Sequence, residues 1–188
     1  MIMEEPAQSS PPRNEADDQP PPETKAQHAP SASIKVDVFD ALNLLSKPAF
    51  ALLTDLATRA LASLPNEGDI RVCIVDDQRM SIAHEKFSGI TGTTDVLTFD
   101  LAPETSSFNQ KIIDTDLTIC YDEAIRQATK LNHPVEHELL LYIIHGTLHC
   151  LGYNDHDDAE YQRMHKKEDE LLAKINIKPI FFTQEPNS

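Results

Sequence analysis

The sequence predicts an α+β fold, a single domain with a small mixed β-sheet packed by helices. Short segments typical of strands and longer segments typical of helices alternate irregularly after residue 33. The last three predicted elements are all helices, which favours a mixed sheet over a doubly wound parallel one. The chain has 188 residues, 40% of them hydrophobic, enough for one core but not comfortably for two.

The first two predicted strands are separated by a helix that starts at a proline. IKVDVF (34–39) alternates apolar and polar residues, as a strand with one buried face does. Pro48 suits the first turn of a helix that continues as AFALLTDLATRALASL and ends at Pro65 and Gly68. DIRVCIV (69–75) is predicted to form the second strand.

The middle of the chain is predicted to form a helix at about 77–87 and then two further strands. The segments DVLTFDL (95–101) and DLTICY (116–121) have the length and the apolar content of strands. A helix at about 122–131 follows them.

The last two predicted helices differ in character. Pro134 opens a strongly apolar helix, VEHELLLYIIHGTLHCL, which Gly152 closes. The final helix, at about 157–175, is highly charged, and acidic residues interleave with its basic ones. This interleaving favours a solvated charged face over a basic stripe that contacts RNA.

The two ends of the chain are predicted to lie outside the domain. Residues 1–33 contain seven of the thirteen prolines and no aromatic residue, and acidic residues outnumber basic ones. Such a segment buries too little apolar surface to offset its ordering entropy, so it is predicted to be a disordered tail. The domain is predicted to span 34–178, with a C-terminal tail at 179–188.

Composition excludes several classes of protein. The net charge of -15, from 31 acidic and 16 basic residues, excludes a globally basic nucleic-acid binder, so contact with RNA would need a local positive patch or a metal. No apolar run reaches the ~20 residues of a membrane span, and the first residues lack an apolar core segment, so we expect no secretory signal. Three cysteines without a C-x-x-C pair indicate reduced thiols. We expect a cytoplasmic protein with no membrane partner.

Residues 145–156, HGTLHCLGYNDH, carry the chemistry of the chain. His145 and His149 are four residues apart on a predicted helix, so both rings project from one face and can bind one ion. Zinc binds neutral imidazole, and a catalytic zinc site takes three protein ligands and keeps an open position. After the turn at Gly152, His156 could supply the third nitrogen. The sequence therefore predicts a zinc site in a cleft formed by the apolar helix and the following turn.

Gly146 supports a special site and disfavours a peptidase. A glycine inside a helix costs roughly 0.5–1 kcal/mol relative to alanine and normally marks the close approach of a backbone or a ligand. In zinc peptidases with the H-E-x-x-H motif, the residue after the first histidine is the general-base glutamate. Because Gly146 occupies this position, peptidase chemistry is disfavoured.

The histidine motif, together with TDVLTF at 94–99, resembles the YbeY family of bacterial single-strand-specific endoribonucleases, which mature rRNA. Its members carry H-G-x-L-H-L-x-G-Y-D-H and an upstream T-D-V-L-[ST]-F, and the resemblance covers roughly 34–177. It implies an α+β fold and one Zn²⁺ per chain. It also implies cleavage of single-stranded RNA in the maturation of the 3′ end of the 16S rRNA precursor and in ribosome quality control, in contact with the ribosome or small-subunit proteins.

The chain departs from the family motif at the third ligand. Family members have five residues between the second and third histidines, whereas six precede His156 here. Asp155 stands at the family position of the third histidine. Either the turn bulges by one residue and His156 binds, which we favour because a loop absorbs an extra residue cheaply, or Asp155 is the ligand.

A second departure concerns positive charge. Many family members have an arginine six residues before the threonine of T-D-V-L, thought to face the RNA phosphate. Ser88 occupies that position, and Lys86 and Arg79 are the nearest basic residues. Because phosphoryl transfer develops charge that a cation stabilises, a ribosome-associated zinc-binding protein with weak or lost nuclease activity is the alternative. Whether water or the 2′-OH is the nucleophile stays open.

One further carboxylate has two interpretations. Asp95, in TDVLTF, could orient a ligand histidine from the second coordination sphere or could be a turn residue at the start of a strand. Cys150 follows His149 directly, and adjacent helical residues point about 100° apart, so it is predicted to pack in the core. His165 is treated as an ordinary histidine.

Overall fold

The computed structural model describes residues 33–103 and 112–180. The predicted N-terminal tail, apart from Ser33, and most of the predicted C-terminal tail lie outside this range. Of the C-terminal tail, Pro179 and Ile180 are described, and the Ile180 backbone N–H donates to the Asp169 carboxylate at 3.0 Å. The domain boundaries at 34 and 178 stay a prediction.

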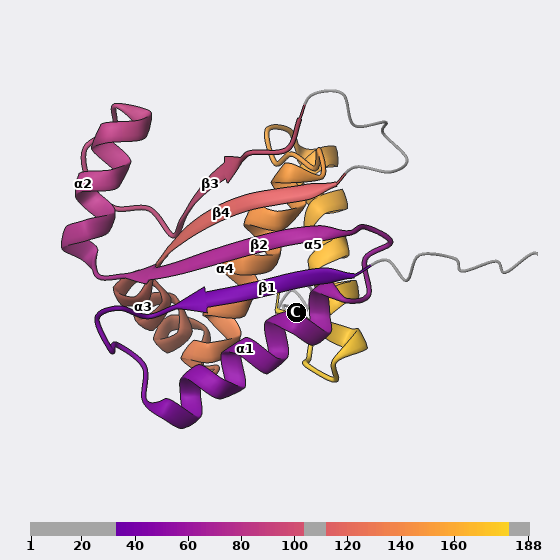
Figure 1. The fold of residues 1–188 in the computed structure, drawn as a ribbon, viewed down its shortest axis with the longest axis horizontal. Helices are drawn as coiled ribbons and strands as arrows, with labels where there is room; N and C mark the ends of the chain where they lie inside the picture. The colour runs from indigo at the N-terminus through magenta and orange to yellow at the C-terminus, as the bar shows by residue number, and fades with distance from the viewer. Residues whose placement is uncertain (1–32, 104–111, 181–188) are drawn as a thin grey trace, which may run out of the picture. The chain divides into compact units, whose positions relative to one another are not determined.

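The described strands form one mixed sheet of four strands in the order β1-β2-β4-β3 (Figure 1). Their bounds are β1 Ile34–Phe39, β2 Gly68–Val75, β3 Val96–Asp100 and β4 Ile113–Cys120. β1 and β4 pair parallel to β2, whereas β3 pairs antiparallel to β4. The strand that comes last in the sequence therefore lies between two earlier strands.

One face of this sheet is apolar. Side chains alternate between the two faces of a strand, and the buried set on β2 is Ile70, Val72 and Ile74. The register places Val72 beside Leu117 of β4, so apolar residues line up across the sheet. On the opposite face Arg71 forms ion pairs with Asp114 and Asp116. The alternation in the sequence thus defines which face receives the helices.

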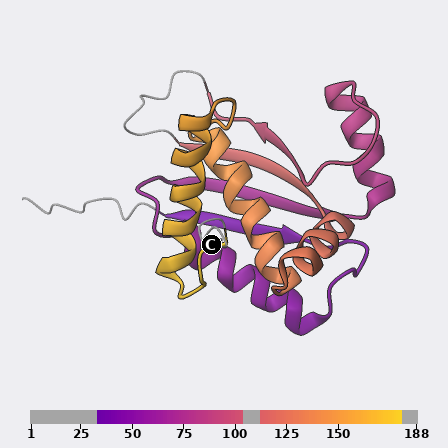
Figure 2. The same cartoon turned by 180° about the vertical axis from the view of Figure 1, so that it is seen from behind.

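Four of the five described helices cover the apolar face, and one stands apart (Figures 1 and 2). The helices are α1 Lys47–Leu61, α2 Asp77–Ser88, α3 Tyr121–Leu131, α4 Val135–Cys150 and α5 Asp158–Lys174. α4 packs against β3, β4, α1, α3 and α5, which explains its nearly continuous apolar sequence. α2 is the helix that stands apart, and its Phe87 ring meets the Phe99 ring of β3 edge-on at 4.9 Å.

Gly146 lets α4 approach the sheet closely. A Cβ atom at this position would stand 2.7 Å from Leu117 Cδ2 and 2.8 Å from Thr98 Oγ1, closer than packed atoms approach. The expected close approach is therefore confirmed, and the neighbours are side chains of β3 and β4. One turn of α4 that carries both histidines is thus pressed onto β3 and β4.

The predicted α+β fold with a mixed sheet and three consecutive C-terminal helices is confirmed. Two boundaries differ by three residues or more. Helix α1 ends at Leu61 rather than near Pro65, because the residues after it form a tighter turn, in which the Ser63 and Leu64 N–H groups donate to the carbonyls three residues earlier. Strand β4 begins at Ile113, three residues before the predicted start. No helix in the described part of the chain combines the length and the apolar character needed to cross a membrane.

Candidate metal centre

His145 and His149 lie together on the last two turns of α4. Their Nε2 atoms are 3.0 Å apart, and the rings meet edge-on with centroids 4.6 Å apart. Both residues are half-buried. The predicted pairing of the two histidines on one helix face is therefore what the structure shows.

Hydrogen bonds at the far side of each ring fix which nitrogen carries the proton. His145 Nδ1 lies 2.7 Å from Glu168 Oε1, and His149 Nδ1 lies 3.0 Å from the Tyr153 carbonyl oxygen. A carboxylate and a carbonyl only accept, so both Nδ1 atoms donate. In the neutral rings both Nε2 atoms then present lone pairs to each other. Two such acceptors at 3.0 Å need a cation or a shared proton between them.

The turn after α4 brings a carboxylate to the same place. Gly152 adopts a left-handed conformation with φ of 84°, and the Tyr153 N–H donates back to the Leu148 carbonyl at 3.0 Å. One carboxylate oxygen of Asp155 and one nitrogen of each of His145 and His149 then lie within 4.8 Å of one another. The chain therefore reverses direction directly after the helix, as is typical where a glycine ends a helix.

His156, the favoured third ligand, is not in this group. Asp155 and His156 are both exposed, but among the described residues the three-residue group consists of His145, His149 and Asp155. Successive residues project in different directions, so a turn that directs Asp155 toward the two imidazoles directs its neighbour elsewhere. Asp155 stands at the position that the family motif gives to its third histidine, so the turn keeps the family spacing with a different residue.

The donor set fits a tetrahedral metal ion. Two imidazole nitrogens that bind one zinc at about 2.0–2.1 Å each stand roughly 3.3 Å apart, close to the 3.0 Å observed. Carboxylate oxygen is an accepted third ligand in such sites. The two Nδ1 hydrogen bonds are the outer contacts that metal-binding histidines typically make.

The pKa values of the two rings are shifted in opposite directions. Burial disfavours the charged form of His145, but the hydrogen bond and negative charge of Glu168 outweigh burial and raise the His145 pKa. Burial together with the nearby His145 lowers the pKa of His149. Burial alone would raise the pKa of Glu168, but hydrogen bonds from His145 and His165 hold it below its usual value. Glu168 is therefore ionised at neutral pH.

A cavity of about 440 Å³ opens beside His145. Its walls come from the start of β3 and from α3, α4 and α5, and they include Asp95, Glu123, Glu138 and Tyr161. No lysine or arginine lines the cavity among the residues that the structure describes. The cavity can hold a substrate group beside the candidate metal, but its described walls offer a phosphate no permanent cation.

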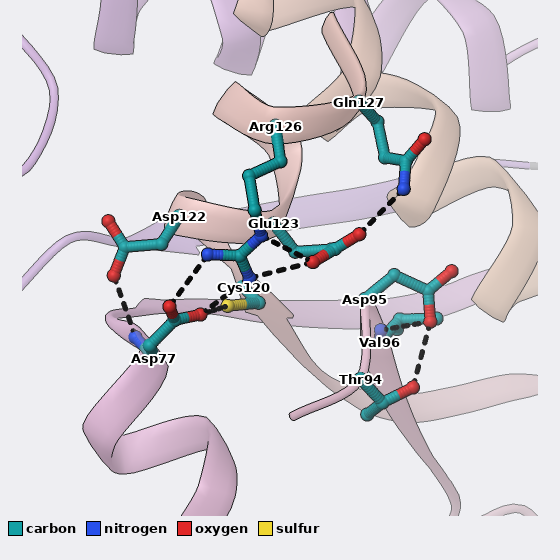
Figure 3. A network of polar contacts seen from close by, with 9 residues as sticks. All are labelled: Asp77, Thr94, Asp95, Val96, Cys120, Asp122, Glu123, Arg126 and Gln127. Atoms are coloured by element: carbon teal, nitrogen blue, oxygen red, sulfur yellow. Dashed lines mark hydrogen bonds and ion pairs between the residues drawn. The ribbon is translucent and has the colours of Figure 1, made fainter. Parts of the chain in front are cut away.

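Asp95 is a turn residue at the start of β3. Its Oδ1 accepts from the Thr94 hydroxyl at 3.0 Å and from the Val96 backbone N–H at 2.8 Å (Figure 3). These local bonds support the second interpretation of Asp95, because the described contacts do not include a hydrogen bond to a ligand histidine. The residue nevertheless lines the cavity beside His145.

Arg126, the arginine drawn in Figure 3, is engaged away from Asp95. Arg126 of α3 forms ion pairs with Asp77 and with Glu123, and Glu123 also accepts from Gln127 at 2.7 Å (Figure 3). Asp77 receives a further hydrogen bond from Cys120 Sγ. The guanidinium thus joins α3 to the start of α2 and is not among the residues that line the cavity.

Ser88, at the family arginine position, does not replace that cation. It lies at the C-terminal end of α2, where its hydroxyl donates to the His84 carbonyl. Nearby, Lys86 lies over the Phe87 ring at 5.0 Å, and Arg79 pairs with Asp76. None of these residues lines the cavity beside His145.

The sequence interpretation missed Glu168 and His165. Both are buried, and both belong to the face of α5 that packs on α4. The available signal was their spacing: Glu168 lies four residues after Met164 and three before Leu171, which are both core residues. Helical periodicity therefore places Glu168 on the buried face of a helix that is otherwise charged.

Comparison with known proteins gives a consistent result. A family model described as Endoribonuclease YbeY matches residues 43–176, more than half of the chain. A protein of Shouchella clausii named Endoribonuclease YbeY is 30% identical over 154 residues, which cover 77% of this chain and 96% of that protein. Proteins with the same name from Corynebacterium glutamicum and Syntrophus aciditrophicus are 34% and 37% identical, over 65% and 62% of this chain and 67% and 74% of their own lengths.

Proposed function

The chain belongs to the endoribonuclease YbeY family, and on that premise we propose that it is a metal-dependent endoribonuclease that cleaves single-stranded RNA. The observation that carries the proposal is the pair of Nε2 atoms 3.0 Å apart with the Asp155 carboxylate beside them. Each ring is oriented from behind by an acceptor, so the pair is preorganised for a cation rather than for packing.

The proposed cofactor is one Zn²⁺ per chain, held by His145, His149 and Asp155. Imidazole and carboxylate together suit zinc, and three protein ligands are typical of catalytic rather than structural sites. Asp155 takes precedence over His156 because only the Asp155 carboxylate lies with the two imidazoles. When bound, such an ion supplies Lewis-acid polarisation of a phosphoryl oxygen and acidifies water.

The residues of the chain have separate tasks in this proposal. His145 and His149 fix the position of the cation, and the buried sheet side of α4 holds that turn of helix rigidly. The cavity lined by Asp95, Glu123 and Tyr161 receives the part of the RNA next to the scissile phosphate. The acidic walls exclude a second phosphate from the cavity, so a nucleoside rather than the backbone occupies it.

The biological substrate that we propose is the 3′ region of the 16S rRNA precursor, with the ribosome or small-subunit proteins as partners, in the cytoplasm. Support for this finer statement comes from the resemblance of the histidine and TDVLTF motifs to the family. A protein with a net charge of -15 also gains from a partner that brings it to RNA, because its own field repels the polyanion.

Cleavage of a labelled single-stranded RNA by the purified full chain tests the proposal. We expect cleavage that a chelator abolishes and added Zn²⁺ restores, with a duplex of the same sequence left intact. His149→Ala is the matched control for a contaminating nuclease. Wild-type cleavage that persists in chelator, or that does not exceed the cleavage by His149→Ala, would contradict the proposal.

Analysis of the cleaved ends identifies the nucleophile. A 2′,3′-cyclic phosphate indicates attack by the neighbouring 2′-OH, whereas a linear phosphate or a free 3′-OH indicates attack by water. An RNA with a 2′-deoxy residue at the cleavage site checks the same point, since only the first route requires the hydroxyl.

A second candidate function is binding to the ribosome with weak nuclease activity. Ser88 at the family arginine position and the absence of lysine and arginine from the described walls of the cavity favour it. Ser88→Arg separates the two functions. A rise in RNA cleavage supports a nuclease limited by charge, because a cation stabilises the phosphoryl oxygens most in the transition state. Co-sedimentation with small subunits and no cleavage by either protein would favour the binding function.

A further inference from the structure

Glu168 is a fully buried carboxylate at the contact of α5 with α4. Its exposed fraction is 0%, and each of its two oxygens faces a histidine. Oε1 lies 2.7 Å from Nδ1 of His145, and Oε2 lies 2.5 Å from Nδ1 of His165. His165 is itself buried and lies beside the Tyr161 ring, with centroids 4.0 Å apart.

Burying this charge is costly, which argues for a role beyond packing. An isolated carboxylate in an apolar interior costs several kcal/mol, and a leucine or methionine on the same helix face would pack without that cost. The cost is offset here only because two N–H groups point at the two oxygens. One of these groups belongs to a candidate metal ligand and the other does not.

We propose that Glu168 is the positioning residue for His145, and that His165 in turn holds the Glu168 carboxylate. This proposal rests on the metal site proposed above and adds a function for α5 within it. By accepting from Nδ1, the carboxylate keeps the proton on that nitrogen and leaves the Nε2 lone pair directed at the ion. By bonding in the ring plane, it also fixes the rotation of the imidazole.

The arrangement makes the two histidines unequal. His149 is oriented by a backbone carbonyl, which carries no net charge, whereas His145 is oriented by an anion. An anion behind the ring makes its Nε2 the more basic donor. We therefore expect His145 to be the stronger ligand of the pair, and this difference depends on a residue from another helix.

Metal affinity of Glu168 variants tests the proposal. We expect Glu168→Gln to bind Zn²⁺ or Co²⁺ about 10–100-fold more weakly than the wild type, in competition with a chromophoric chelator. Asp169→Asn is the matched control: Asp169 is the next residue on α5, is also buried, and accepts from the Ile180 N–H rather than from a histidine. Its metal affinity should stay within about threefold of the wild type, even where its stability falls.

A nitrogen-15 spectrum of the histidine rings in the metal-free protein reports which ring nitrogen carries the proton. A loss of packing alone would not produce the change expected in this tautomer. At alkaline pH the wild type should show His145 with its proton on Nδ1, and Glu168→Gln should show a tautomer mixture. Wild-type affinity in Glu168→Gln together with an unchanged tautomer would overturn the proposal. If the wild type itself binds no metal, the proposed metal site fails, while the tautomer still decides the role of Glu168.

Two variants of His165 keep the test decisive if Glu168→Gln does not fold. His165→Asn preserves an N–H donor near the position of Nδ1, whereas His165→Leu removes it. We expect Asn to retain most of the metal affinity and Leu to lose about tenfold. Equal affinities in the Asn, Leu and wild-type proteins would contradict the part assigned to His165.

Discussion

Helices α4 and α5 both contribute to the candidate metal centre, but their sequences reveal it unequally. In α4 two histidines and a glycine interrupt an apolar helix, so they are conspicuous and demand an explanation. In α5 a buried glutamate and a buried histidine lie among many exposed charges, so they are easily overlooked. The comparison teaches that a polar residue is informative when its surroundings are apolar, and that in a charged helix only its position relative to the core residues identifies it.

The largest effect should come from α4. His149→Ala removes one of the two Nε2 atoms that would bind the ion. We therefore expect stoichiometric metal binding and RNA cleavage to be lost. The loss should exceed the 10–100-fold typical of outer-sphere residues. Metal content of the dialysed protein and cleavage of single-stranded RNA measure it. A variant that keeps its metal would show that the conspicuous histidines of α4 are not the ligands.

The turn after α4 decides the third ligand and should give the next largest effect. We expect Asp155→Ala to weaken metal binding severely and His156→Ala to change it by less than about threefold, because only Asp155 lies with the two imidazoles. Asp155→His, which restores the family residue, should bind zinc at least as tightly as the wild type. Zinc affinities measured side by side at pH 7.5 check the ranking, and the reverse order would show that the turn bulges toward His156.

Gly146→Ala tests how tightly α4 is pressed onto the sheet. Alanine favours the helix by up to about 1 kcal/mol, but its Cβ would stand 2.7 Å from Leu117 Cδ2. We expect a net destabilisation of about 1–3 kcal/mol from overpacking, measured by urea denaturation. A stabilised variant would mean that the strand side chains move aside easily, and that rigidity of this turn does not come from the sheet.

The smallest effects should come from the exposed charges of α5. Lys166→Ala and Glu170→Ala change side chains on the solvent face, so stability should stay within about 0.5 kcal/mol and metal affinity should not change. Both are measured with the same denaturation and chelator assays. A loss of RNA binding in Lys166→Ala alone would give the charged face of α5 a role in substrate contact. The contribution of α5 would then not be limited to its buried residues.

Most of the fold could be predicted from the sequence because the sheet has one apolar face. IKVDVF alternates clearly, and β1 spans Ile34–Phe39 as predicted. The start of β4 was missed because Asp114, which precedes the predicted start, lies on the outer face and pairs with Arg71. Such cross-strand ion pairs depend on which strands become neighbours, and that order is not encoded locally.

The candidate site, like the fold, could be predicted from the sequence only in part. The pairing of His145 and His149 follows from helical spacing alone, and the left-handed Gly152 follows from its place at a helix end. The preference for His156 over Asp155 was argued from loop length, which does not determine the direction in which a turn projects a side chain. Glu168 could not be assigned to His145 from the sequence, because the packing of α5 on α4 determines that contact.

The strand order β1-β2-β4-β3 has a consequence for the timing of assembly. Among the described strands β3 pairs with β4 alone, so during synthesis from the N-terminus it has no partner until β4 has emerged. The turn of α4 with Gly146 then packs on side chains of both strands. During synthesis the partners therefore become available in the order β4, α4 and α5, and the Glu168 contact of His145 can form only after α5 has been made.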